Sequence, residues 1–134
     1  MALETEEVEL DRDICAEGVA AVFADSKHGF YLVAEQDGRV VASTLITYEW
    51  SDWRNGVVWW IQSVYVHPEY RKKGVYRQLH KFVENEAAND PDVVGLNLYV
   101  YKENSIARGA YESLGMVQSS SLIYSTPDLK TKST

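Results

Sequence analysis

A basic segment with a glycine, Arg71-Lys72-Lys73-Gly74-Val75-Tyr76, follows an apolar run and precedes an amphipathic stretch. The first N–H groups of a helix lack intrahelical partners and carry partial positive charge, so a helix beginning here could receive a phosphate group. Gly74 would let the backbone approach such a ligand closely. The alternative is an ordinary solvated basic loop, and the spacing alone does not decide between the two.

A second pair of candidates is Asn104 and Tyr111, which are seven residues apart. Seven residues are two helical turns, so both side chains would lie on one face of a helix. A tyrosine hydroxyl can donate a proton to a leaving thiolate. The alternative is that Asn104 only caps the helix and Tyr111 packs against a sheet.

Several other catalytic patterns are missing from the sequence. It lacks the Gly-x-x-x-x-Gly-Lys-Ser/Thr and Gly-x-Gly-x-x-Gly phosphate loops, the Gly-x-Ser-x-Gly elbow and the His-Glu-x-x-His zinc motif. Kinase, dehydrogenase, serine hydrolase and zinc peptidase functions therefore lose their main support. The single cysteine, Cys15, cannot form an intramolecular disulfide, and three scattered histidines predict no metal site.

The elements that would position these candidates alternate in type. Hydrophobic periodicity and turn residues predict the order α-β-β-β-α-β-α-β, a mixed sheet with helices on its faces, in the α/β or α+β class. The Gln36-Asp37-Gly38 turn predicts an antiparallel hairpin. The predicted helices span 13–24, 74–88 and 105–114, and the predicted strands span 30–35, 39–49, 57–66, 93–101 and 116–125.

The composition is that of one globular domain. The chain has 134 residues, is 46% hydrophobic and carries a net charge of −7. Such a charge disfavours nucleic acid and anionic membranes as partners. The acidic start is not a signal peptide and no run could span a membrane, so we expect a cytoplasmic protein. The ends, 1–10 and 126–134, are expected to be mobile.

Two motifs together resemble the GNAT superfamily of acetyl-coenzyme A (acetyl-CoA)-dependent N-acetyltransferases. The stretch Ser63-Val64-Tyr65-Val66-His67-Pro68-Glu69-Tyr70-Arg71-Lys72-Lys73-Gly74-Val75 is similar to the family's central strand and its Arg/Gln-x-x-Gly-x-Gly/Ala loop. Asn104-x-x-Ala107-x-x-x-Tyr111-x-x-x-Gly115-Met116 is similar to the second signature, Asn-x-x-Ala-x-x-x-Tyr-x-x-x-Gly-Phe. The likeness covers about 100 residues, from Phe30 to Tyr124. Tyr76 departs from it, because the family usually has Gly or Ala there.

The resemblance implies a GNAT fold and the roles of particular residues. The central strand would part from its neighbour at a bulge, and pantetheine would lie in the gap like an added strand. A backbone N–H there would polarise the thioester carbonyl. Asn104 would contact pantetheine and Tyr111 would protonate the coenzyme A thiolate. The matching backbone is that of Val64, Tyr65 and Val66, and the diphosphate would sit on N–H groups of Arg71, Lys72, Lys73, Gly74, Val75, Tyr76 and Arg77.

The acceptor amine must lose a proton before it attacks, because alkylammonium groups titrate near pH 10. In the polyamine acetyltransferases, which the hairpin and the Trp-rich strand also resemble, a Glu on the central strand often serves as base. Gln62 stands in the matching position and cannot take a proton, so it could only orient a water. Glu49 and Asp52 are the alternative bases. Acids and aromatic rings suit a cationic amine; the candidate substrate-binding residues are Glu49, Trp50, Asp52, Trp53 and Trp60.

Three functions stay open at this point: an N-acetyltransferase of a small primary amine, an acetyltransferase of protein N-termini or lysines, and a non-catalytic acyl-CoA-binding module. GNAT domains usually begin with an edge strand and a first helix, whereas only about a dozen residues precede the helix at 13–24. We therefore expect the first strand to be absent or vestigial. The strand near Tyr31–Ala34 would then be a bare edge that a homodimer partner could cover.

Overall fold

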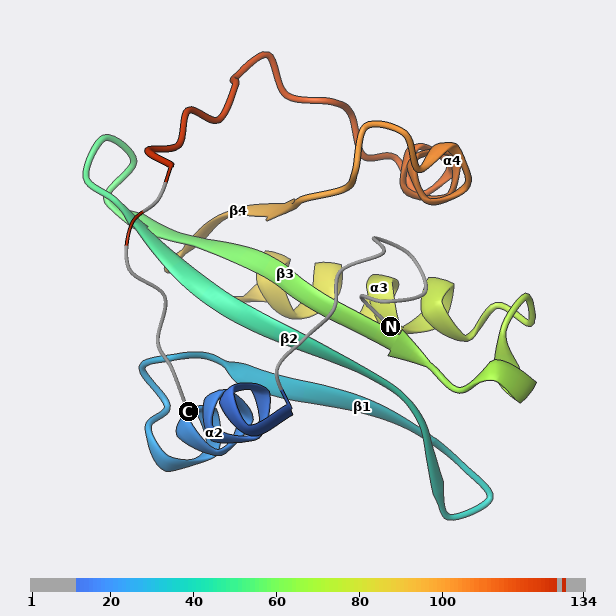
Figure 1. Ribbon diagram of the computed structural model, residues 1–134. Coiled ribbons are helices and arrows are strands. Elements are labelled where there is room, and N and C mark those ends of the chain that lie inside the picture. The colour runs from blue at the N-terminus through green and yellow to red at the C-terminus, as the bar shows by residue number, and fades with distance from the viewer. Residues whose placement is uncertain (1–11, 128, 130–134) are drawn as a thin grey trace. The chain divides into compact units, whose positions relative to one another are not determined.

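The computed structural model describes residues 12–127 and residue 129 (Figure 1). In chain order the elements are α2 (Arg12–Ala24), β1 (Phe30–Gln36), β2 (Arg39–Ser51), β3 (Gly56–Val66), the 3₁₀ turn η1 (Pro68–Tyr70), α3 (Val75–Asn89), β4 (Val93–Leu98) and α4 (Ser105–Ser113). The described residues divide into two compact units. One contains residues 19–99, and the other contains residues 12–18 together with the described residues from Val100 onward.

The first unit is built on a four-stranded mixed sheet in the order β1-β2-β3-β4. The β1–β2 and β2–β3 pairs are antiparallel and the β3–β4 pair is parallel. Short turns join the antiparallel strands, whereas α3 makes the crossover that a parallel pair requires. The predicted mixed, mostly antiparallel sheet with flanking helices is therefore confirmed.

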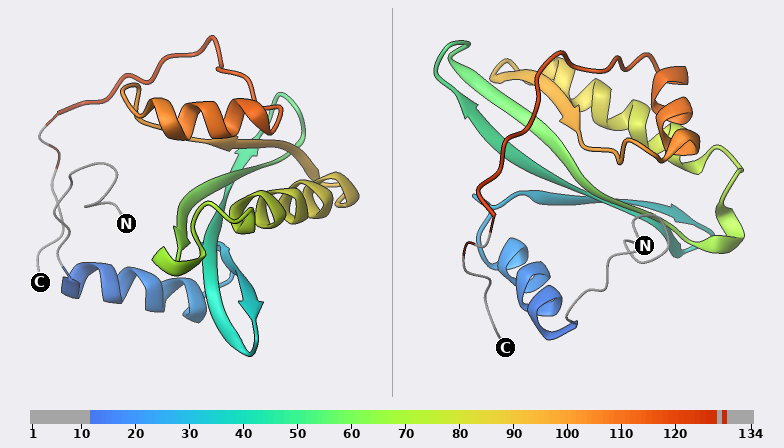
Figure 2. Two further views of the ribbon diagram at one scale, coloured as in Figure 1. Left: turned by 90° about the vertical axis from the view of Figure 1, so that its right-hand side faces the viewer. Right: turned by 45° about the horizontal axis from the view of Figure 1, so that its top comes forward.

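The central strand β3 carries a bulge and then parts from β4. Leu45 pairs with Ser63 but Ile46 pairs with Ile61, so Gln62 is the extra residue in β3. On the other side, pairing with β4 runs only from Val57↔Val93 to Ile61↔Leu98 (Figure 2). Among the described residues, the stretch 62–66 has β2 on one side and no strand on the other. The predicted splayed pair is present, and it opens at the bulge.

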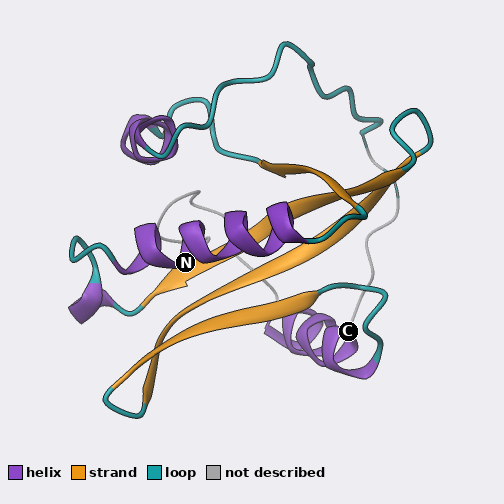
Figure 3. Ribbon diagram, turned by 180° about the vertical axis from the view of Figure 1, so that it is seen from behind, coloured by secondary structure: helices purple, strands orange, loops and turns teal. Residues whose placement is uncertain are grey.

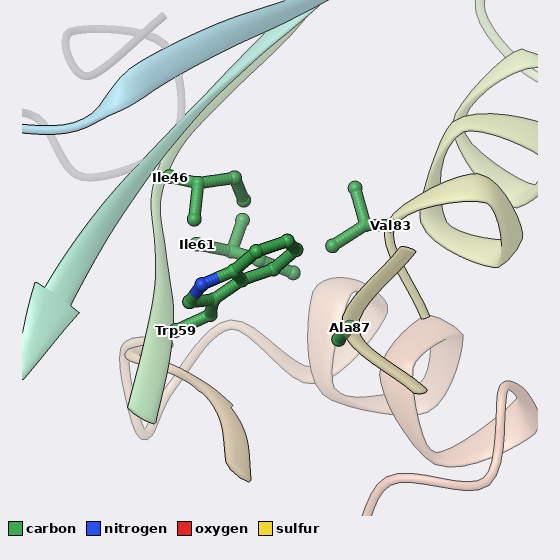
Figure 4. Packing of buried hydrophobic residues seen from close by; sticks show 5 residues of the cluster. All are labelled: Ile46, Trp59, Ile61, Val83 and Ala87. Atoms are coloured by element: carbon green, nitrogen blue, oxygen red, sulfur yellow. The ribbon is translucent and has the colours of Figure 1, made fainter. Parts of the chain in front are cut away.

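The core lies between the sheet and α3, which crosses one face of it (Figure 3). Ile46 and Ile61 from the sheet, Val83 and Ala87 from α3 and the ring of Trp59 form the main cluster (Figure 4). Trp59 is 7% exposed. On the opposite face of the sheet, Phe23 of α2 stacks on Tyr31 of β1, with ring centroids 5.4 Å apart.

Two sequence predictions were wrong. No strand forms over 116–125: the backbone there makes no ladder, and Val117, Leu122 and Tyr124 are exposed. Three consecutive serines interrupt the apolar alternation, and the hydroxyl of Ser119 accepts the N–H of Ser121, a local bond that competes with strand pairing. The strand predicted to reach Tyr101 ends at Leu98. The other boundaries agree within one or two residues.

Some expectations fall on parts of the chain outside the described residues. The expected absence of a first strand and the expected mobility of residues 1–10 concern that part of the chain, as does most of the expectation for 126–134. Within the described residues β1 is an edge strand with β2 as its partner. None of the helices in this part of the chain has the length and apolar character needed to cross a bilayer.

Candidate active site

A hollow of about 260 Å³ opens on the sheet face opposite α3, beside the point where β3 and β4 part. Its lining comes from β2, from β3 and from the residue that follows β4. The lining residues are Thr47, Tyr48, Glu49, Trp60, Gln62 and Tyr99. Successive residues of a strand point to opposite faces, so Trp60 reaches this hollow because Trp59 is in the core. The structure thus brings together three predicted site residues, Glu49, Trp60 and Gln62.

Glu49, Trp60 and Tyr99 form a connected group in the hollow. The indole Nε1 of Trp60 donates a hydrogen bond of 3.0 Å to Oε1 of Glu49. The Trp60 ring stacks on Tyr99, with centroids 4.4 Å apart and an interplanar angle of 22°. One carboxylate is therefore held beside two aromatic rings. Tyr48 lines the same hollow, and its partial burial, with a smaller effect of Asp90, raises the pKa of its hydroxyl, which keeps it protonated.

The other predicted substrate residues lie elsewhere on the β2–β3 hairpin. Trp50 pairs with Val57 and is 63% exposed. Asp52 accepts the N–H of Trp53 at 2.9 Å in the connecting turn, and Trp53 is 95% exposed. These three residues do not line the hollow. The carboxylate of Asp52 already serves the turn, which leaves Glu49 as the acidic residue at the hollow.

The basic loop folds against the end of β3 before α3 begins. Nε of Arg71 donates to the carbonyl of Val66 at 2.9 Å, and the guanidinium lies 6.0 Å from the Tyr65 ring centroid. Lys72 and Gly74 both have positive φ, of 61° and 79°. Gly74 is the N-cap of α3, and its carbonyl accepts the N–H of Gln78 as the first helical bond. The N–H groups of residues 75–77 therefore precede the helical ladder and face outward from its start.

Tyr76 is held on the inner side of α3. Its hydroxyl lies 2.9 Å from Nδ1 of His80, and its ring packs against the cluster of Ala42, Val66 and Leu79. His80 is 1% exposed, and its Nε2 lies 3.1 Å from Oε1 of Glu84. Burial lowers the pKa of His80, and the nearby Glu84 opposes this with a smaller effect. The large side chain thus packs along α3 toward the core.

The second signature lies in the other unit, on α4. Oδ1 of Asn104 accepts the N–H of Ala107 at 3.1 Å, so Asn104 is the helix N-cap. Tyr111 is half-buried two turns further along the same helix, and its carbonyl accepts the N–H of Leu114 and of Met116. The cap uses the side-chain carbonyl oxygen of Asn104, and its side-chain NH2 group is the one that can donate a hydrogen bond to a ligand.

Two features fit an extended ligand with a diphosphate, such as acetyl-CoA. The β3 backbone at 62–66 has no strand on its β4 side among the described residues. At the loop, nothing lies within 4 Å of the position that a Gly74 Cβ would occupy, so a ligand can approach this backbone. Within the described residues no group of His, Cys, Asp and Glu could hold a metal ion.

Sequence reasoning missed Tyr99 as part of the site. It was assigned to the interior of a strand over 93–101, whereas it follows the last β4 residue, at the parting of the strands. The family resemblance contained the signal, because it predicted that the central strand parts from its neighbour. The first residue past the last β3–β4 pair must then border the gap. Thr47 and Tyr48 were likewise not singled out, although they belong to the same acidic and aromatic segment as Glu49.

Comparison with known proteins gives a family match. The profile of the acetyltransferase (GNAT) family matches residues 2–116. A search of curated proteins found no match. Among solved structures, a protein from Clostridium difficile 630 described as a possible acetyltransferase is 45% identical, with a TM-score of 0.91 over 96% of this chain and 85% of that one.

Two more distant structures share the fold. An aminoglycoside 6'-N-acetyltransferase from Acinetobacter haemolyticus is 18% identical, with a TM-score of 0.73 over 96% of this chain and 90% of that one. An aminoglycoside N-acetyltransferase in complex with CoA is 23% identical, with a TM-score of 0.66 over 88% of each chain.

Proposed function

Since the chain belongs to the GNAT acetyltransferase family, we propose that it transfers an acetyl group to the primary amine of a small cationic metabolite, by direct attack in a ternary complex. The protein is an acyltransferase, and its acyl donor is acetyl-CoA. In the transfer the neutral amine nitrogen forms a bond to the acetyl carbonyl carbon, and the carbon–sulfur bond breaks. The ammonium form releases one proton to water before the attack, and the second proton that nitrogen loses balances the one that sulfur gains.

The observation that carries the proposal is the open backbone of β3 beyond the bulge, followed along the chain by the basic loop and the N-terminus of α3. On the open edge of β3, the backbone N–H groups of Val64 and Val66 would hold an extended arm and polarise a carbonyl, while the N–H of Tyr65 between them faces β2. The loop from Arg71 through Arg77 would hold the diphosphate by backbone N–H groups and positive charge. Acetyl-CoA supplies an activated thioester, and these residues would orient it.

The signature on α4 assigns roles in the reaction to two further side chains. Asn104 would donate its amide N–H to a carbonyl of the pantetheine arm, and Tyr111 would protonate the departing thiolate. Their support is the signature at 104–116 and their two-turn spacing on one helix. Gln62, at the bulge, would orient a water that carries the proton away from the amine.

The choice of a small cationic amine rests on the hollow. A carboxylate, two aromatic rings and a net charge of −7 all favour a cation. The two aminoglycoside acetyltransferases of similar fold act, by their names, on small molecules.

Three further expectations are proposals as well. We propose that Trp50, Asp52 and Trp53 contact the acceptor from outside the hollow. A homodimer and a cytoplasmic location also stay proposals; sedimentation of the purified chain and cell fractionation would test them.

The test supplies acetyl-CoA with a panel of amines and follows free thiol. Because a general acid accelerates typically by 10²–10⁴, we expect Tyr111→Phe to lower kcat about a hundredfold with little change in the KM for acetyl-CoA. Tyr124→Phe, an exposed tyrosine of the same unit, is the control. Tight CoA binding without turnover of any amine would overturn the proposal and favour a binding module. Turnover of peptides alone would favour the protein acetyltransferase.

A further inference from the structure

We propose that Thr44 is a positioning residue for the transfer, because its hydroxyl fixes the peptide that would present the Val64 N–H to the acetyl carbonyl. This role rests on the proposed function and adds a further residue to the same reaction. Thr44 lies on β2, directly opposite Val64 of β3, and is 2% exposed. It lies outside both family signatures.

Thr44 is a polar residue in an otherwise apolar row of β2. Ala42 and Ile46, two residues away on either side, are 1% and 0% exposed and face the same side of the sheet. The hydroxyl Oγ1 of Thr44 donates a hydrogen bond of 2.7 Å to the backbone carbonyl of Ser63. Valine would fill the position with nearly the same shape, so this hydrogen bond is the property that threonine adds.

The Ser63 carbonyl belongs to the same peptide unit as the Val64 N–H. This peptide is planar and trans, so its C=O and N–H point in opposite directions across the strand. The bond from Thr44 holds the carbonyl on the β2 side, which directs the N–H to the other edge of β3. A bond just past β3 agrees with this direction: the His67 N–H donates to the carbonyl of Val41 on β2, and N–H directions alternate along a strand.

This peptide has less support than an ordinary peptide of a sheet. It follows the bulge at Gln62, where the regular pairing with β2 is interrupted. On the other edge of β3 the pairing with β4 ends at Ile61, and among the described residues no strand lies there beside 62–66. The side-chain bond from Thr44 therefore replaces part of the support that ladder bonds give elsewhere in the sheet.

A fixed N–H at this place has a direct consequence for the reaction. Negative charge develops on the acetyl oxygen when the amine attacks, and a donor that is already oriented stabilises this charge without reorganising. A carbonyl that accepts a hydrogen bond also makes the N–H of its own peptide a stronger donor. Thr44 would thus act on the transition state through Val64, without touching the substrate itself.

The test replaces Thr44 by valine, which removes the hydroxyl. Loss of a whole oxyanion donor costs about 10²–10³ in kcat, so loosening one should lower kcat about tenfold. The KM for acetyl-CoA should change little, because the basic loop and α3 are intact. Thr44→Ser keeps the hydroxyl and should retain most of the native kcat. Val93→Ala, which loses core contacts at the start of β4, is the control for stability and should keep kcat.

A second measurement observes the donor directly. The carbonyl stretch of the thioester in bound acetyl-CoA falls in frequency when an N–H polarises the bond, and isotope-edited infrared spectroscopy without acceptor measures it. We expect this shift from free acetyl-CoA in the native chain and in Thr44→Ser, and a smaller shift in Thr44→Val. A loss of stability alone, as in Val93→Ala, should leave the frequency at its native value.

The outcomes separate this role from the proposed function. Native kcat and a native stretch in Thr44→Val would overturn the role, and so would equal losses in Thr44→Val and Thr44→Ser. If Thr44→Val does not fold, Thr44→Ser is compared with Thr44→Ala, which differs from it by the hydroxyl alone, and equal values would overturn the role. Each of these results leaves an amine acetyltransferase in place. Absence of turnover with every amine would instead refute the proposed function, and the stretch would still decide the role of Thr44.

Discussion

The buried histidine of α3 is a residue whose ionisation is expected to affect folding. His80 is 1% exposed and contacts the Tyr76 hydroxyl and Glu84. Burial lowers its pKa below the ordinary value near 6.5, so the unfolded chain binds a proton more readily than the native one. Stability from the neutral imidazole is complete above pH ~6.5 and is lost as the pH falls from there through the native pKa.

We therefore expect the free energy of unfolding to fall between pH 7 and pH 5 more steeply in the native chain than in His80→Gln. Glutamine can still accept a hydrogen bond from the Tyr76 hydroxyl, but it does not titrate. Urea unfolding at several pH values measures both slopes. His28→Gln, at an exposed histidine, is the control and should keep the native slope. Parallel slopes in the native chain and His80→Gln would contradict this assignment.

Tyr76 shows what the sequence could and could not reveal about single residues. The loop motif showed that a large side chain replaces the usual Gly or Ala, but not where it goes. Its direction depends on His80, one turn along α3, and on a cluster with β2 and β3 residues that are distant in sequence. Glu49 and Trp60 were selected by residue type, whereas their hydrogen bond depends on the cross-strand register of β2 and β3.

At the scale of elements, the loop before α3 depends on a backbone conformation that favours glycine. Gly74 has φ 79°, and nothing would obstruct an added Cβ. Gly74→Ala should therefore cost about 1–2 kcal/mol of stability by backbone strain alone. The helix start would shift to relieve this strain. We expect the KM for acetyl-CoA to rise several-fold while kcat changes little, because the chemistry lies elsewhere.

A second glycine provides the matched control. Gly109 lies inside α4 and has an ordinary helical backbone. Nothing lies within 4 Å of the position that an added Cβ would take there. Gly109→Ala should stabilise the chain by about 0.5–1 kcal/mol through helix propensity. Thermal unfolding measures the stability of both variants, and initial rates measure their KM for acetyl-CoA. If Gly74→Ala is as stable as the native chain and keeps its KM, the loop conformation does not position the donor.

The elements themselves could be predicted where periodicity and turns were strong. The hairpin, the central strand and α3 are where their patterns placed them, and the splay followed from the family resemblance. The failure at 116–125 has a physical reason. Apolar residues there suit a strand, but a strand also needs a neighbour whose backbone N–H and C=O groups are free to pair. In addition, local hydrogen bonds of the serines compete with pairing. Sequence pattern carries no information about that partner.

At the scale of the whole molecule, two opposing fields act on an anionic donor. The net charge of −7 repels it, while Arg71, Lys72, Lys73 and Arg77 attract it locally. Within a Debye length the local charges dominate, so added salt should weaken binding. We expect the KM for acetyl-CoA to rise as ionic strength increases from about 0.05 to about 0.3 M.

Removing the local charges should reverse this dependence. In the double variant Lys72→Gln and Lys73→Gln the net charge goes from −7 to −9, since two positive charges are lost. Repulsion by the rest of the molecule then outweighs the reduced local attraction, and added salt screens that repulsion. The KM should therefore stay level or fall with salt, from a higher starting value. The control, Lys27→Gln with Lys102→Gln, has the same net charge but an intact loop, so its KM should still rise. A matching rise in the loop variant would show that the diphosphate does not bind at this loop.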